Sequence, residues 1–270
     1  MYKFVIPFYY LSYSRLKSLP EKLSLVWIYP LFLMVFLFGF YQLEINPHFF
    51  SFFLAFVAWI SIYEIGYLEN DALTIKKEAH PNFRINQEDI DLINKNFRRI
   101  AWIRILIFMG FTSSLYHFNF CSIEQIVWFV SIVIFARFFF YLHNVIRSRW
   151  NIISYFFLCL SKYWVFPILY LGLGHGFDPY LIVLCCFPVL RTIEHAVKPK
   201  YKISWLKKLV GSLDVFRVKY YSIVLLFSFL ISCGFSFTPI LIYSIAYFYI
   251  FRLGVWMLIG SGKYSRESIT

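Results

Sequence analysis

Long apolar runs alternate with short polar segments along almost the whole chain. A helix needs about 20 mainly apolar residues to cross the roughly 30 Å hydrocarbon core of a membrane. Eight runs approach that length, and they cover residues 25–41, 48–68, 100–117, 123–143, 152–173, 179–194, 220–235 and 239–260. The pattern predicts an all-α, polytopic bundle of about eight transmembrane helices, which forms a single integral membrane domain over residues 1–270.

The basic residues lie on alternate links between these runs. The links after the first, third, fifth and seventh runs are short and carry no Lys or Arg. The other links and both ends of the chain carry the basic residues, and such an excess marks the cytoplasmic side of a membrane. We therefore expect an even number of spans with both termini in the cytoplasm. The default location is a bacterial inner membrane, because the chain begins without the features of a cleaved signal or targeting peptide.

Two of the expected cytoplasmic loops are long, and they cover residues 69–99 and 195–219. Within the first, Ile90, Ile93 and Phe97 have helical spacing, which predicts a short amphipathic helix over residues 87–97 on the membrane face. The stretch before residue 24 contains Pro7 and Pro20 and lacks a cleavage site of small residues. We expect this stretch to be retained and to lie in the membrane interface.

Composition supports the membrane assignment and excludes other classes. Hydrophobic residues make up 60% of the chain, aromatic residues make up 23%, and the mean hydropathy is +0.66. These values exceed those of water-soluble domains. The net charge of +12 lies in short segments between apolar runs, so we expect membrane lipid and not nucleic acid as a partner. The five cysteines form no CxxC pair, so neither a disulfide framework nor a zinc site is expected.

An acidic and amide cluster ends the second run. Asp71, Thr74 and Glu78 can share one helical face. Carboxylates so placed could hold Mg²⁺ on a diphosphate, because hard cations take oxygen ligands and often keep phosphate as a co-ligand. Three nearby side chains could meet the remaining phosphate charge: Lys76, Lys77 and Arg84. The alternative is a solvated loop beside the membrane whose charges cap the helix.

These residues resemble the first motif of the UbiA superfamily of intramembrane prenyltransferases. That motif has the form NDxxDxxxD at the end of the second helix, followed by a basic element. The corresponding residues here are Asn70, Asp71, Thr74 and Glu78, then Pro81 and Arg84. The family's second motif, DxxDxxxD, ends the sixth helix. At that place the chain has Arg191, Glu194 and Lys198, followed by Lys202, Ser204 and Gly211.

The end of the fourth run is also similar to the family, which has a tyrosine and a basic residue there. The chain places Tyr141, Asn144 and Arg147 in that segment. The resemblance implies a UbiA-like helical arrangement, with the ninth helix of typical members either missing or unrecognised near a terminus. It also implies a membrane-embedded prenyltransferase that moves a polyprenyl group from its diphosphate to an unidentified acceptor.

Site residues follow from the resemblance position by position. The two acidic motifs of the family face each other and hold Mg²⁺ against an isoprenyl diphosphate. Carried over to this chain, the catalytic residues are Asp71, Glu78 and Glu194, and the metal ligands are Asn70, Asp71, Glu78 and Glu194. The expected diphosphate contacts are Asn70, Lys76, Lys77, Arg84, Arg147, Arg191, Lys198 and Lys202.

Three acids of the family pattern are replaced here by Thr74, Arg191 and Lys198. Two readings remain open. Arg191 and Lys198 could neutralise the diphosphate directly, so that one metal ion suffices for transfer. The alternative is a non-enzymatic binder or transporter of an isoprenoid phosphate or a lipid-linked glycan intermediate, since basic replacements suit anion binding better than metal catalysis.

Charged residues inside the apolar runs are a further signal, because a charge near the bilayer centre is costly unless it is paired or faces a cavity. Glu64 and Lys162 are expected to pair. Arg137 and Arg252 are expected to snorkel to the interface. His80 and His195 are candidate bases toward an acceptor. The aromatic runs 49–56 and 135–141 could line a tail cavity, although most of their rings must face lipid or neighbouring helices.

Overall fold

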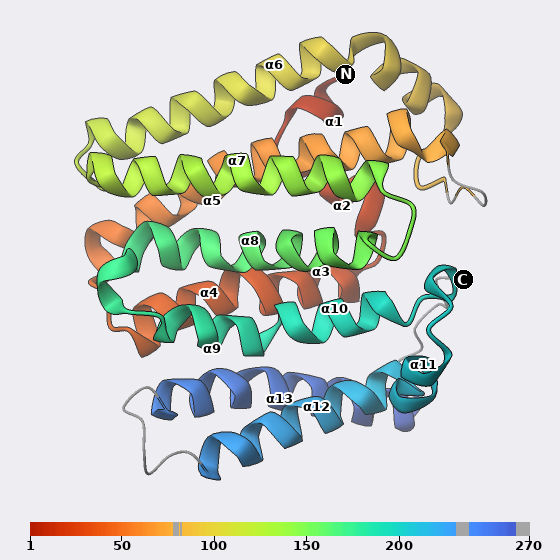
Figure 1. Ribbon diagram of the computed structural model, residues 1–270. Coiled ribbons are helices and arrows are strands. Elements are labelled where there is room, and N and C mark those ends of the chain that lie inside the picture. The colour runs from red at the N-terminus through yellow and green to blue at the C-terminus, as the bar shows by residue number, and fades with distance from the viewer. Residues whose placement is uncertain (78–80, 82, 231–237, 263–270) are drawn as a thin grey trace. The chain divides into compact units, whose positions relative to one another are not determined.

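The computed structural model describes residues 1–77, 81, 83–230 and 238–262, and the regular structure in these ranges is entirely helical (Figure 1). The all-α prediction is therefore confirmed for this part of the chain. Contacts between the elements group the chain into two compact units, Met1–Gly174 and His175–Thr270. Each unit is described by itself.

Seven helices within the described residues are long and apolar enough to cross a membrane, as expected of a multi-pass membrane protein. They are Leu19–Phe40, His48–Thr74, Gln87–His117, Ile123–Val145, Asn151–Leu171, Asp178–Ala196 and Pro239–Gly260. The predicted run 220–235 falls partly on residues that the structure does not describe. The expected count of about eight spans therefore remains a prediction.

The first unit opens with three short helices and a long, irregular span. The helices are α1 (Tyr2–Val5), α2 (Tyr9–Arg15) and α3 (Leu19–Val26), and the span continues through the π-helix η1 (Trp27–Leu31), α4 (Phe32–Met34) and the π-helix η2 (Val35–Phe40). Pro30 lies inside η1, and a proline removes a backbone donor from a helix. A wider helical turn at this place accommodates that loss.

Four long helices follow in the first unit. α5 (Ile45–Leu68) runs on into the π-helix η3 (Glu69–Thr74) and the 3₁₀ turn η4 (Ile75–Lys77). α6 (Gln87–His117), α7 (Ile123–Val145) and α8 (Asn151–Leu171) then run back and forth beside it, and the 3₁₀ turn η5 (Leu173–His175) follows. α5 packs against α6 and α7, and α7 packs against α8. The ends of α5 and α7 and the starts of α6 and α8 therefore lie at one end of this unit (Figure 1).

α5 and α7 approach each other closely at Gly66. A Cβ atom added there would lie 2.4 Å from Cγ of Phe140, so only glycine fits beside this ring. Asn144, one turn further along α7, donates from Nδ2 to the carbonyl oxygen of Gly66 at 3.0 Å. The C-terminal end of α5 is thus fixed against α7 by close packing and by one buried hydrogen bond.

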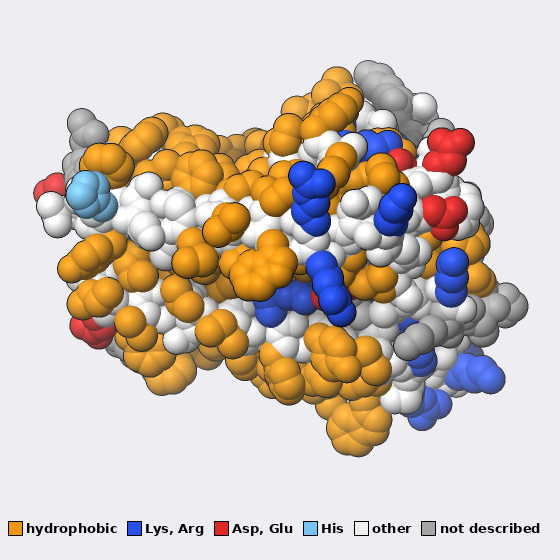
Figure 2. Space-filling view, turned by 90° about the horizontal axis from the view of Figure 1, so that it is seen from above, with side chains coloured by type: hydrophobic (Ala, Val, Ile, Leu, Met, Phe, Trp, Pro, Cys, Tyr) orange, Lys and Arg blue, Asp and Glu red, His pale blue; other side chains and the backbone are white. Residues whose placement is uncertain are grey.

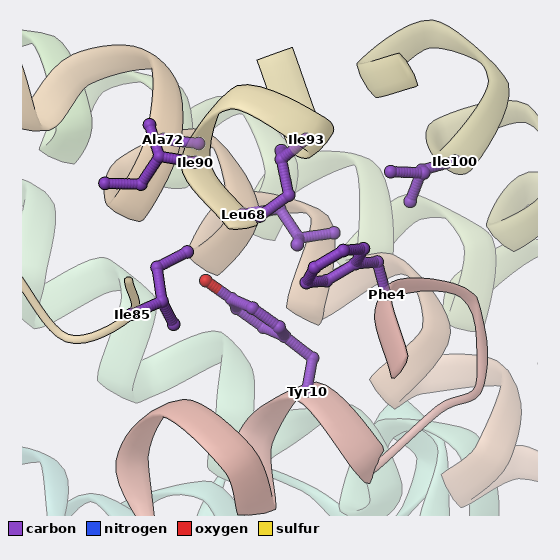
Figure 3. Close-up of a cluster of buried hydrophobic side chains, with 8 residues drawn as sticks. All are labelled: Phe4, Tyr10, Leu68, Ala72, Ile85, Ile90, Ile93 and Ile100. Atoms are coloured by element: carbon purple, nitrogen blue, oxygen red, sulfur yellow. The ribbon is translucent and has the colours of Figure 1, made fainter. Parts of the chain in front are cut away.

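The N-terminal segment packs against other helices of the first unit, and its expected place in the membrane interface stays a prediction. α1 contacts α6, and α2 contacts α5. Figure 3 shows Phe4 and Tyr10 beside apolar side chains from the end of α5, the following loop and the start of α6. These side chains are Leu68, Ala72, Ile85, Ile90, Ile93 and Ile100.

The amphipathic helix expected over residues 87–97 is the first part of α6. Ile90 and Ile93 are fully buried in the cluster of Figure 3, and Phe97 packs at its margin. The apolar face therefore meets the protein, because the N-terminal segment covers it. Asn86 caps this helix and accepts a hydrogen bond from the backbone N–H of Asp89 at 2.8 Å.

Glu64 pairs with Arg104, and the expected pair of Glu64 with Lys162 is wrong. The Arg104 Nη1 to Glu64 Oε2 distance is 2.8 Å, and both side chains are fully buried. Lys162 instead lies over the ring of Tyr29, with Nζ 4.2 Å from its centre. Arg104 is the favoured partner because its helix, α6, packs directly on α5. Its guanidinium also offers more hydrogen-bond donors than the ammonium group of a lysine.

One face of the molecule illustrates how side chains are distributed on the surface. Figure 2 shows hydrophobic side chains over much of this face, with most Lys and Arg side chains gathered in one half of the view. Exposed apolar residues of α6 and α7 include Trp102, Leu106, Met109, Ile134 and Phe138. Helices that expose such residues along their length suit a lipid environment.

The second unit contains α9 (Asp178–Cys186), α10 (Pro188–Ala196), the 3₁₀ turn η6 (Pro199–Tyr201), α11 (Ser204–Val210), α12 (Leu213–Leu230) and α13 (Thr238–Gly260). The predicted run 179–194 is two helices, which meet at Phe187. Pro188 supplies no backbone donor and disfavours a helical residue before it, so the helix is interrupted there. α13 contacts α9 and α12, and α10 contacts α12.

Candidate functional site

The carboxylate of Asp71 is the centre of the candidate site in the first unit. The π-helical turn η3 directs this side chain into the protein, where it is completely buried. It accepts hydrogen bonds from Tyr10 Oη at 2.9 Å and from Asn70 Nδ2 at 3.0 Å. It also accepts from Arg15 Nη2 at 2.8 Å and from Arg84 Nη1 at 3.2 Å. Its oxygens are thus surrounded by donors from three separate segments.

Arg15 and Arg84 bring two positive charges to this single carboxylate. Arg15 comes from the end of α2, and its guanidinium carbon lies 4.1 Å from the centre of the Tyr67 ring, a cation–π contact. Among the described residues, its buried Nε atom has no hydrogen-bond partner. The Arg84 side chain is 37% exposed. Burial and the neighbouring charge of Arg15 lower the pKa of Arg84.

Tyr10 connects this site to the apolar cluster beneath it. In Figure 3 its hydroxyl points into the space between Ile85 and Leu68. Burial and the neighbouring Asp71 carboxylate raise the pKa of Tyr10. The phenol is therefore a neutral donor at physiological pH, and it contributes one hydrogen bond to Asp71 without adding charge.

A second ion pair lies next to Asp71. Arg137 of α7 donates from Nη2 to Glu69 Oε1 at 2.7 Å, so it pairs with protein and the expected snorkelling is wrong. Arg147 follows α7 and donates from Nη2 to the carbonyl oxygen of Thr74 at 3.0 Å. The structure therefore brings Asn70, Asp71, Thr74, Arg84 and Arg147 to one end of the first unit.

Other residues expected at this site lie elsewhere or outside the described ranges. Lys76 is exposed beside it. The Lys77 side chain, Glu78 and His80 lie outside the part that the structure describes. Tyr141 is 57% exposed and does not join Asp71.

The aromatic runs supply core packing. Phe52 and Phe56 stack with ring centres 5.8 Å apart, and Phe166 contacts both rings. Phe49, Phe50, Phe53 and Phe138 are exposed on the outside. The crevice between α5 and α7, lined by Trp59, Tyr63 and Phe140 among others, is filled by side chains and leaves no room for a water molecule.

The surroundings of Asp71 do not suit Mg²⁺. A metal ion needs free carboxylate oxygens, whereas those of Asp71 already accept bonds from two guanidiniums, an amide and a phenol. Within the described ranges, no three His, Cys, Asp or Glu side chains gather into a possible metal site. The residues described around Asp71 favour an anion over a cation.

The second motif lies in the second unit and is also surrounded by arginines. Glu194 of α10 is buried and pairs with Arg191 of the same helix and with Arg217 of α12. Arg217 also donates from Nη1 to Asp214 Oδ1 at 2.8 Å. Lys198 and Lys202 are exposed after α10. His195 is buried and hydrogen bonded to Tyr201.

Sequence reasoning missed several residues at both centres. Tyr10 and Arg15 lie in an N-terminal stretch that has no periodic pattern of apolar residues from which its packing could be predicted. Arg217 lies 23 residues after Glu194, so spacing alone does not connect them. Arg104 carried a usable signal, because it is a charge inside the apolar run 100–117.

Comparison of the chain with protein-family models, with curated proteins and with solved structures finds no match.

Proposed function

We propose that this membrane protein binds the phosphate headgroup of an isoprenoid diphosphate at the C-terminal end of α5, and that it does so without a resident metal ion. The observation that carries this proposal is the convergence of Arg15 and Arg84 on the buried Asp71 carboxylate. Two guanidinium charges against one carboxylate leave a net positive charge, which favours an anionic ligand.

Asp71 acts in this proposal as a positioning residue. It fixes the planes of both guanidiniums, which then present their remaining N–H groups in a fork that matches phosphate oxygens. Nε of Arg15 has no partner in the part of the protein that the structure describes, and Arg84 is exposed enough to meet a ligand. A headgroup so bound would leave its hydrocarbon chain among lipids, beside the exposed apolar surface of the helices.

Binding to the detergent-purified full chain tests this proposal. Farnesyl diphosphate should raise the unfolding temperature equally with EDTA and with Mg²⁺, and the rise should be clearly smaller in Arg84→Gln. Arg99→Gln is the matched control, because Arg99 is an exposed arginine of α6, and it should keep the rise. A rise that is unchanged in Arg84→Gln, or no rise in any condition, contradicts the proposal.

Prenyl transfer is the second candidate. The observation that favours it is the bond from Arg147 to the carbonyl of Thr74, which places a basic residue from the end of α7 beside the first motif, as the resemblance to the UbiA superfamily implies. In this reaction the bond between the allylic carbon and the diphosphate oxygen breaks, and both electrons leave on the diphosphate. Guanidiniums would stabilise that charge, while the acceptor supplies an electron pair and loses a proton to solvent.

Transfer and binding differ in their need for metal. Transfer predicts release of diphosphate from farnesyl diphosphate in membranes that supply an acceptor, with dependence on both Mg²⁺ and Asp71. Such release would favour prenyl transfer over binding alone. Tight binding in EDTA without release would support binding alone.

A further inference from the structure

Arg252 is a buried arginine without a partner in the described part of the chain. It lies on α13, and its side chain is almost fully buried, with 5% of the residue exposed. Across the residues that the structure describes, it forms no ion pair and no hydrogen bond, and Nε is among the buried atoms without a partner. Its guanidinium carbon lies 5.2 Å from the Phe251 ring centre. The expectation that Arg252 snorkels to the interface is therefore wrong.

Two further arginines lie near it. Arg191 of α10 and Arg217 of α12 both hold Glu194, and the charges of all three residues act on Arg252. α10, α12 and α13 thus each contribute a guanidinium to one region of the second unit. Among the described residues, the carboxylates paired with these arginines are Glu194 and Asp214, so three positive charges meet two negative charges there, and one positive charge is left over.

A buried, unmatched charge costs stability, and the cost is larger inside a membrane. A purely structural role does not explain Arg252, because the described protein gives nothing for its guanidinium to hold. Charges kept in this way within membrane helices characteristically face a ligand or an ion pathway. Arg217 differs from Arg252, because Glu194 and Asp214 accept hydrogen bonds from its guanidinium and hold it in a fixed orientation.

We propose that Arg191, Arg217 and Arg252 form a phosphate-binding site in the second unit, in which Arg252 is the residue that meets the ligand. Guanidinium groups bind phosphate oxygens through paired N–H donors and need no metal to do so. This site is built entirely from residues of the second unit and does not depend on Asp71, Arg15 or Arg84. The phosphate group can come from a lipid headgroup or from free diphosphate.

Arg252→Met tests the site, since methionine keeps the apolar length of the side chain and removes the charge. In the purified full chain without ligand, this change should raise the unfolding temperature by about 2–4 °C, because an unmatched buried charge is removed. Two probes, sodium diphosphate and farnesyl monophosphate, are then titrated in EDTA into chains that carry Arg84→Gln, so that the site in the first unit does not contribute. At least one should bind the Arg84→Gln chain, and adding Arg252→Met should weaken that binding at least tenfold.

The two probes distinguish the sources of the phosphate. Binding of both indicates a site for free diphosphate as well as lipid, and binding of the farnesyl compound alone indicates a lipid headgroup. Arg252→Lys keeps the charge and should retain part of the affinity. Lys208→Gln, an exposed change on α11, should leave affinity and unfolding temperature unchanged.

The outcomes separate this site from the one in the first unit. Binding of either probe that survives Arg252→Met unchanged overturns this inference, as does a lowered unfolding temperature in that variant, which indicates a structural role. If Arg252→Met loses binding while Arg84→Gln keeps it fully, the site in the second unit stands and the proposed function at Asp71 fails.

Discussion

Glu64 and Arg104 form an ion pair in which neither side chain has any exposed surface, and this pair holds the N-terminal segment in place. Glu64 accepts hydrogen bonds from the backbone N–H groups of Leu11 and Phe8 at 2.7 and 3.2 Å. Arg104 donates from Nε to the carbonyl of Phe4 at 2.6 Å and from Nη2 to that of Ile6 at 3.4 Å. The backbone of residues 4–11 is thus tied to both charges, which places Tyr10 and Arg15 beside Asp71.

Breaking this pair should destabilise the protein strongly. We expect Arg104→Met to cost about 3–5 kcal/mol of unfolding free energy, because Glu64 is left buried and uncompensated. Denaturant unfolding in detergent measures the loss. Glu44→Gln is the control, since Glu44 is exposed. A cost below about 1 kcal/mol would show that Glu64 finds another partner.

Exchanging the two charges should not restore stability. In Glu64→Arg with Arg104→Glu, the donors of the new arginine face backbone N–H donors, and the oxygens of the new glutamate face carbonyl oxygens. Neither side chain can then form the hydrogen bonds of the native pair. The double variant should therefore unfold as easily as Arg104→Met. Recovery to native stability would mean that direct attraction between the charges outweighs the backbone contacts.

The close approach of α5 to α7 gives a prediction about Gly66. Gly66→Ala should destabilise the protein by about 1–3 kcal/mol, because its methyl group overlaps the Phe140 ring. Gly110→Ala is a matched control in α6, where an added methyl meets nothing within 4 Å, and it should be neutral or slightly stabilising. Adding Phe140→Leu to Gly66→Ala should recover part of the loss, and equal unfolding temperatures for the two alanine variants would refute the packing argument.

The hydrogen bonds of Asp71 can be separated by two substitutions of similar size. Tyr10→Phe removes one neutral donor and should cost about 1 kcal/mol. Asp71→Asn removes the charge that orients both guanidiniums and should cost about 2–3 kcal/mol. Thermal unfolding compares the variants, and ligand titration should show near-native affinity in Tyr10→Phe only. A larger loss of affinity in Tyr10→Phe than in Asp71→Asn would mean that the phenol contacts the ligand.

The membrane helices could be predicted from the sequence because segments such as α5 are apolar on every side and need no partner to be recognised. The break at Phe187 was not predicted, because the apolar run 179–194 has the pattern of one span, although Pro188 carries a signal for it. Partners of buried charges were harder to predict, because Glu64 could meet any charge on a helix packed against α5, and the sequence alone does not say which helix that is.

The chemistry of the two motifs was harder still to predict. The resemblance to the UbiA superfamily implied that Asp71 and Glu194 are metal ligands, whereas the structure surrounds each with guanidiniums. Arg191 lies three residues before Glu194, a spacing that brings side chains together on a helix. Arg15 and Arg217 come from other elements, so their approach depends on tertiary packing.

The central claim is that arginines, and not a metal ion, hold a phosphate ligand in this protein. The measurement that tests it most directly is the affinity of farnesyl diphosphate for the purified full chain, titrated in EDTA and again in Mg²⁺. We predict dissociation constants within about twofold of each other in the two buffers. In the Arg252→Met chain, which lacks the second proposed site, adding Arg84→Gln should weaken binding at least tenfold. Binding that appears only with Mg²⁺ and is unaffected by Arg84→Gln would contradict the claim and return the acidic residues to the role of metal ligands.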